Sequence, residues 1–95
     1  MYPGTFSKLS ESTLASATTL TPTTEVVRVT GVTAIVNITV PATSNFSTVL
    51  YVIPTGIFTW TAAGNIGLAG TAVVGKLIIF VYSRSQKKWY PSVIA

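Results

Sequence analysis

The sequence predicts an all-β protein, built as a compact antiparallel β-sandwich or barrel with an extended N-terminal arm. From Thr23 onward the chain is rich in Val, Ile, Thr, Tyr, Phe and Trp, interrupted by Gly, Pro and Asn, which is the composition of short consecutive strands. No apolar pattern with the period of a helix runs through this part. A length of 95 residues fits one domain. We therefore expect an arm over residues 1–22 and a β domain over residues 23–95.

The arm is predicted from residues that do not make a regular pattern. Residues 1–22 are rich in Ser and Thr, and their apolar residues are isolated from one another. A short helix over residues 10–17, capped by Ser10, is an alternative that the Ser and Thr content weakens. An arm with spaced apolar anchors would become ordered on a partner.

The strands are predicted from short runs of β-forming residues that end at Gly, Pro or Asn. In the run over residues 33–40, alternation places one set of apolar side chains on one face: Ala34, Val36, Ile38 and Val40. Phe58 and Trp60 also share a face, because they lie two residues apart. The expected strands cover residues 25–30, 33–40, 48–53, 57–61, 66–68, 76–82 and 89–94.

Two of these strands are apolar on both faces. Residues 49–53 have the sequence VLYVI and residues 77–82 the sequence LIIFVY. One core covers only one face of a sheet, so we expect another subunit or another protein to cover the second face. Charged residues make up only 8% of the chain, against roughly 25% in an ordinary soluble domain. The alternative is a two-layer sandwich whose outer face tolerates a few exposed apolar residues.

Glycine occupies every third position from Gly64 to Gly70. The segment lacks the spacing of a phosphate loop or a dinucleotide fingerprint. We expect tight turns that need a positive φ, with close backbone approach around a symmetry axis as the alternative. Gly75, just before an apolar strand, indicates a bulge or bend.

The composition excludes most enzyme chemistry. The chain has no His, Cys or Asp, and its only acids are Glu11 and Glu25. Catalytic triads, general acid/base pairs and metal sites draw on those side chains. We therefore predict that the protein is not an enzyme and has no cofactor, no metal and no small-molecule substrate. The longest apolar stretch, residues 72–82, is interrupted by Lys76 and is too short to span a membrane.

The net charge of +4 includes a small basic cluster, Arg84, Lys87 and Lys88. It is interpreted as a solvated turn, with attraction to an acidic surface as the alternative. We do not expect nucleic acid as a partner, because such sites usually carry larger clusters interleaved with aromatic residues.

Two segments together resemble a known module. Residues 51–76 have the sequence YVIPTGIFTWTAAGNIGLAGTAVVGK, and residues 87–92 have the sequence KKWYPS. Over roughly residues 20–92 the chain resembles a module of structural proteins of tailed bacteriophages, which include small capsid decoration (cement) proteins and the ends of head or tail fibres. In such modules the turn before the closing Trp often carries Asp-Gly, which the basic residues 83–88 replace here.

The resemblance implies a virion protein, commonly trimeric, that binds the major capsid protein on the capsid exterior and stabilises the shell. An intertwined trimeric β structure is the alternative to a compact fold. The residues expected to dock the arm on the capsid are Tyr2, Phe6, Leu9 and Leu14. Those expected to build the homotrimer are Tyr51, Ile53, Phe58, Trp60, Ile78 and Phe80. The alternative function is a fibre tip that binds a host receptor or glycan, with contacts from Arg84, Lys87, Lys88 and Trp89.

Overall fold

The computed structural model describes residues 11–40 and 49–92, which form nine strands and no helix. This confirms the predicted all-β class. The strands are β1 (Glu11–Ala15), β2 (Thr19–Leu20), β3 (Val26–Thr30), β4 (Asn37–Ile38), β5 (Val49–Pro54), β6 (Thr59–Trp60), β7 (Gly70–Thr71), β8 (Ile78–Ser83) and β9 (Lys88–Pro91).

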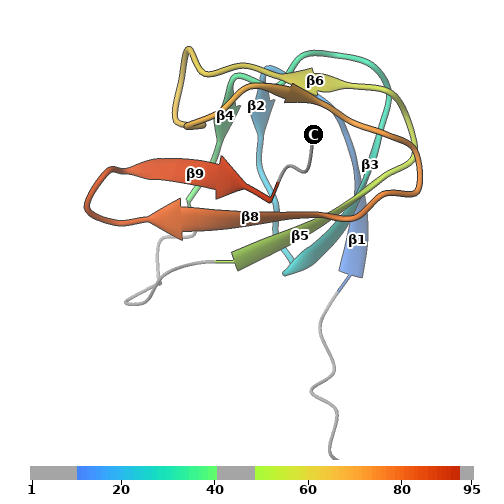
Figure 1. Ribbon diagram of the computed structural model, residues 1–95. Coiled ribbons are helices and arrows are strands. Elements are labelled where there is room, and N and C mark those ends of the chain that lie inside the picture. Colours follow the sequence, from blue (N-terminus) through green and yellow to red (C-terminus); the bar gives the residue numbers. More distant parts are fainter. Residues whose placement is uncertain (1–10, 41–48, 93–95) are drawn as a thin grey trace, which may run out of the picture.

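The strands make two layers that enclose the core (Figure 1). One layer is a five-stranded sheet in the order β1-β3-β5-β8-β9. The other consists of two short pairs, β2-β4 and β6-β7, joined by a bridge between Ile35 and Trp60. The five-stranded sheet therefore has one face toward the core and one face away from it.

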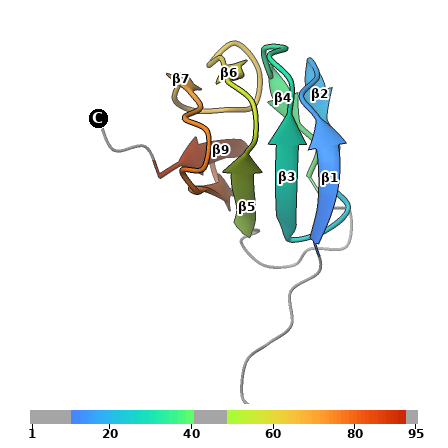
Figure 2. The ribbon, with the colours of Figure 1, turned by 90° about the vertical axis from the view of Figure 1, so that its right-hand side faces the viewer.

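The five-stranded sheet is mixed, which corrects the prediction of an antiparallel fold. β1, β3 and β5 run parallel, as do β2 and β4 (Figure 2). From β1 to β6 the chain alternates between the layers, so β1, β3 and β5 are each followed by a short strand across the core. Parallel neighbours need such a crossover, and here a strand supplies it in place of the usual helix. Within the five-stranded sheet, β8 and β9 return as antiparallel strands, and in the other layer β6 and β7 also pair antiparallel.

Residues 11–20 belong to the β domain, which corrects the predicted arm boundary at residue 22. β1 pairs along its whole length with β3, and the Ser12 and Thr24 hydroxyls lie 2.8 Å apart. Leu20 is only 2% exposed. A Ser/Thr-rich segment can form a strand here because a neighbouring strand supplies its backbone hydrogen bonds. Residues 1–10 of the predicted arm lie outside the described residues.

The chain crosses between layers at Ser16, which is buried. The Ser16 N–H donates to the Thr30 carbonyl at 2.7 Å, and the Ser16 hydroxyl accepts a bond from the Thr33 N–H at 3.0 Å. The hydroxyl thus satisfies a backbone donor where the ladder of the sheet ends. Gly31, with φ of 85°, makes the neighbouring bend after β3.

The second predicted strand, over residues 33–40, differs from the alternating pattern. Its ordered pairing is limited to β4 and the bridge at Ile35, and its buried residues are Ile35 and Ile38, three apart. The intervening Asn37 side chain accepts a hydrogen bond from the Asn65 N–H at 3.1 Å. The predicted face of Ala34, Val36, Ile38 and Val40 is therefore wrong.

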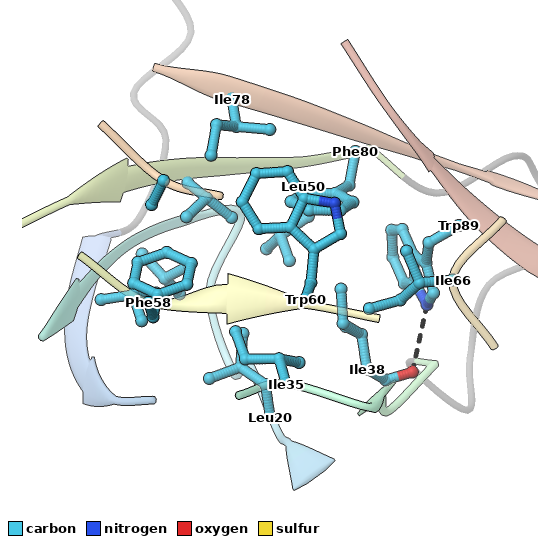
Figure 3. Packing of buried hydrophobic residues seen from close by; sticks show 14 residues of the cluster. Leu20, Ile35, Ile38, Leu50, Phe58, Trp60, Ile66, Ile78, Phe80 and Trp89 are labelled. Atoms are coloured by element: carbon cyan, nitrogen blue, oxygen red, sulfur yellow. Dashed lines mark hydrogen bonds between the residues drawn. The ribbon is translucent and has the colours of Figure 1, made fainter. Parts of the chain in front are cut away.

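The core contains four large aromatic residues, and the predicted shared face of Phe58 and Trp60 is confirmed. The Trp60 ring packs edge-on against Phe80, with centroids 5.6 Å apart, and lies 6.1 Å from Phe58. Trp89 is completely buried among the core residues (Figure 3), and its ring packs against Tyr82 with centroids 5.3 Å apart. Aliphatic residues from both layers fill the remaining volume.

Asn65 joins the two layers at the β9 side. Its Oδ1 accepts from the Ile38 N–H at 2.8 Å, and its Nδ2 donates to the Ile38 carbonyl at 2.7 Å. The same carbonyl accepts a 3.1 Å bond from Trp89 Nε1 (Figure 3). The Asn65 backbone continues the sheet, since its carbonyl accepts from the Trp89 N–H at 2.7 Å. We call this set of contacts the Ile38–Asn65–Trp89 junction.

Glycines 64, 67 and 70 provide space, not the positive φ that the sequence predicts. Positive φ among the described glycines is found at Gly31 and Gly75 only. A Cβ at Gly64 would collide with Asn37 and with the Val36 carbonyl, one at Gly67 with the Tyr90 ring, and one at Gly70 with the Trp60 ring. The close approach is within one chain. Gly75, with φ of 83°, makes the predicted bend before β8.

The junction predicts that the two tryptophans respond differently to Phe. Trp89→Phe removes a donor bonded to Ile38, whereas the buried Nε1 of Trp60 has no partner among the described residues. Both changes remove similar volume, so Trp89→Phe is expected to lower the free energy of unfolding by about 1–2 kcal/mol more than Trp60→Phe. Urea unfolding of the two variants measures this difference. Equal losses would contradict a stabilising role for the Trp89 hydrogen bond.

Candidate interaction surface

The five-stranded sheet presents a row of apolar side chains on the face away from the core. Burial alternates along β5, so that Leu50 and Val52 face the core. Their neighbours face outward and are paired across strands, Tyr51 with Ile79 and Val81 with both Val49 and Tyr90. We call this surface the outer sheet face; it comprises Val49, Tyr51, Ile53, Ile79, Val81 and Tyr90.

The outer sheet face is partly open to solvent. Val81 and Tyr90 are each 41% exposed, and the residues from β5 together with Ile79 are half-buried. Strand alternation produces this arrangement directly, because a run such as Ile79-Phe80-Val81 sends its middle residue into the core and its neighbours outward. β5 and β8 are therefore apolar on both faces, as their sequences predict.

The predicted oligomer contacts separate into two groups. Phe58, Trp60, Ile78 and Phe80 are between 0% and 6% exposed, so they belong to the core of the single chain. Their assignment to a subunit interface is wrong, because the facing layer of the same chain already covers them. Tyr51 and Ile53 lie on the outer sheet face, where a contact with another molecule stays a prediction.

The predicted tip contacts lie in and beside the turn between β8 and β9. Arg84 and Lys87 are exposed, and Lys87 has a φ of 58°. Lys88 is half-buried, and its Nζ donates to the Gly64 carbonyl at 3.4 Å. Trp89 is fully buried and forms part of the junction, which removes it from any surface contact. Residues of Asp-Gly type would fit a positive φ here more easily than Lys.

Of the four predicted capsid-docking residues, one lies in the part of the chain that the structure describes. Tyr2, Phe6 and Leu9 lie outside the described residues. Leu14, on β1, is half-buried and packs against the core, so it supports the sheet and does not extend from it.

The described residues offer few features of a small-molecule site. A cleft lined by Trp60, Val73 and Leu77, among others, has a volume of only about 70 Å³. Ligand pockets usually measure at least about 300 Å³. Residues 11–40 and 49–92 contain no group of three His, Cys, Asp or Glu that could hold a metal ion. This part of the chain also has no helix long and apolar enough to cross a membrane.

Comparisons with known proteins give a fold and no family. No protein-family model matches the chain, and no curated protein matches it. A solved structure described as "Structure of a chaperone-substrate complex" has a similar fold, with a TM-score of 0.55 and 13% sequence identity. The similarity covers 85% of this chain and only 16% of the other chain. At this identity the likeness concerns the fold alone.

Neighbouring residues of β8 provide a test of the two faces. Phe80→Ala is expected to lower the free energy of unfolding by about 3–5 kcal/mol, because it opens a cavity in the core. Val81→Ala should cost at most about 1 kcal/mol, since Val81 lies on the outer sheet face. Urea unfolding at one protein concentration compares them. Similar losses would show that both faces of β8 are covered in the isolated protein.

Proposed function

We propose that the protein is a structural virion protein that binds the outer surface of a bacteriophage capsid and stabilises it by bridging capsomers. The observation that carries this proposal is the outer sheet face. It places apolar side chains of β5, β8 and β9 side by side on a surface whose backbone is fixed by sheet hydrogen bonds. Exposed apolar surface of this kind marks contact sites with other macromolecules.

The energetics of a shell favour a small binder of this type. Apolar area removed from water contributes about 25 cal/mol per Å². A single small contact gives modest affinity, but the gain repeats at every equivalent position of a capsid. A copy that touches two capsomers also makes its second contact intramolecular, which adds avidity without new chemistry.

The sequence supports the proposal in two further ways. Residues 51–76 and 87–92 resemble modules of tailed-phage virion proteins. Tyr2, Phe6 and Leu9 offer a second set of apolar anchors. The homotrimer expected from the resemblance stays a prediction, and so does the major capsid protein as the partner.

A matched pair of apolar-to-Lys variants tests the proposal. Val81→Lys places a charge on the outer sheet face, whereas Val32→Lys changes a residue that is 74% exposed and lies just after β3, off that face. Wild type and Val32→Lys are expected to cosediment with undecorated capsids of the phage that encodes the protein. Val81→Lys should bind at least about tenfold more weakly, because its charge would be desolvated on docking.

Thermal unfolding of both variants provides the control for folding, and both should melt within a few degrees of wild type. Capsid binding by Val81→Lys at wild-type strength would contradict docking through the outer sheet face. Absence of wild type from capsids, together with binding to host cells, would instead support the fibre-tip alternative. Affinity for nucleic acid that falls steeply with salt would instead support a nucleic-acid-binding accessory protein.

A further inference from the structure

The five-stranded sheet has one open edge, at β1. No described strand pairs with the side of β1 opposite β3. Open edges are sites of strand pairing between molecules, and native proteins usually protect them with Lys, Pro or a bulge. β1 has the sequence ESTLA, with no Lys, no Pro and no bulge, and its one charged residue, Glu11, stands at its first position.

The backbone groups at this edge follow from the pairing with β3. The Ser16 N–H donates to the Thr30 carbonyl, so the backbone groups of Ser16 point toward β3. Because backbone direction alternates along a strand, those of Ser12 and Leu14 point the same way. The N–H and C=O groups of Glu11, Thr13 and Ala15 therefore point outward from the edge.

The opposite edge of the sheet is blocked within the chain. At β9, the Trp89 N–H donates to the Asn65 carbonyl and the Trp89 carbonyl accepts from the Gly67 N–H, each at 2.7 Å. The next outward-facing residue, Pro91, has no N–H to donate. A second copy that extends this sheet must therefore use its own β1.

We propose that β1 pairs with β1 of a second copy, antiparallel, about a twofold axis at Thr13. This pairing does not depend on the capsid function proposed above. The outward groups of Glu11, Thr13 and Ala15 are symmetric about Thr13, so an antiparallel copy satisfies all of them. Thr13 lies opposite Thr13 of the second copy, and Glu11 lies opposite Ala15.

The side chains of β1 are compatible with this register. Glu11, the one charged residue of β1, does not face its own copy, so like charges are not opposed across the axis. Leu14 is half-buried on the inner side of the sheet, where an added strand would cover it further. Thr has a high preference for strands, and opposed Thr side chains can form a hydrogen bond.

The pairing would make one ten-stranded sheet from two five-stranded sheets. The two outer sheet faces would then lie on the same side of the dimer, as a single doubled surface. A contact made by five residues of one strand is small, so the dimer is expected to form in a concentration-dependent way.

Disulfide formation tests the register directly, because the chain has no cysteine. In a hydrogen-bonded antiparallel pair the opposed Cα atoms lie about 5.5 Å apart, which suits a disulfide. Thr13→Cys is therefore expected to give a covalent dimer rapidly under mild oxidation. Arg28→Cys is the control, since Arg28 is exposed beside Thr13 on β3. Three strand spacings, about 14 Å, would separate its two copies, which is too far for a disulfide.

Charge substitutions test the same twofold axis without forming a covalent bond. Thr13→Lys and Thr13→Glu each oppose like charges and should weaken self-association about tenfold or more. A mixture of the two variants should restore the dimer, because Lys then faces Glu. Sedimentation velocity over a range of concentrations measures self-association of each variant and of the mixture. Circular dichroism confirms that each variant is folded.

Three results would overturn the proposal. They are a wild-type protein that stays monomeric at every concentration, a trimer that is insensitive to both Thr13 variants, and equal oxidation rates for Thr13→Cys and Arg28→Cys. Capsid binding can succeed or fail independently of these results, so the two proposals are tested separately.

Discussion

The closure of this fold, by which we mean the joining of its two layers on the β9 side, depends on hydrogen bonds to the carbonyl of Ile38. This carbonyl accepts hydrogen bonds from Asn65 Nδ2 and from Trp89 Nε1, while the Ile38 N–H donates to Asn65 Oδ1. One asparagine side chain thus acts as a strand partner for β4, and its backbone acts as a strand partner for β9. Without these bonds the backbone N–H and C=O of the buried Ile38 would be left unpaired, and among the described residues only the Asn37 side chain would still bond to the Asn65 segment.

This closure determines which surfaces stay available. The chain alternates between layers through β6, so both layers share one core, which includes Phe58 and Trp60. The segment around Asn65 then occupies the β9 edge, which leaves the outer sheet face and the β1 edge for other molecules. A surface made by strand alternation is fixed by the same packing that stabilises the core. Binding there would require little reorganisation of the chain.

The sequence predicted the long strands well because β-branched runs between turn residues are local patterns. β3, β5 and β8 were found in this way, close to their observed bounds. β1 and β2 were missed because their pairing partners, not their Ser/Thr-rich sequence, make them strands. The period of a strand also cannot show which of two neighbouring aromatics faces inward, so Trp89 was expected at the surface. The role of the glycines at 64, 67 and 70 could not be predicted, because it depends on the positions of residues that are distant in the sequence.

Amide hydrogen exchange followed by NMR tests the closure most directly. The N–H groups of Ile38, Gly67 and Trp89 are held by bonds of the junction and its continuation into β9. If the junction closes the fold, these amides should exchange only by global unfolding, with the same protection as the core strand β3. Exchange of these three amides through local opening, while β3 stays protected, would contradict the account.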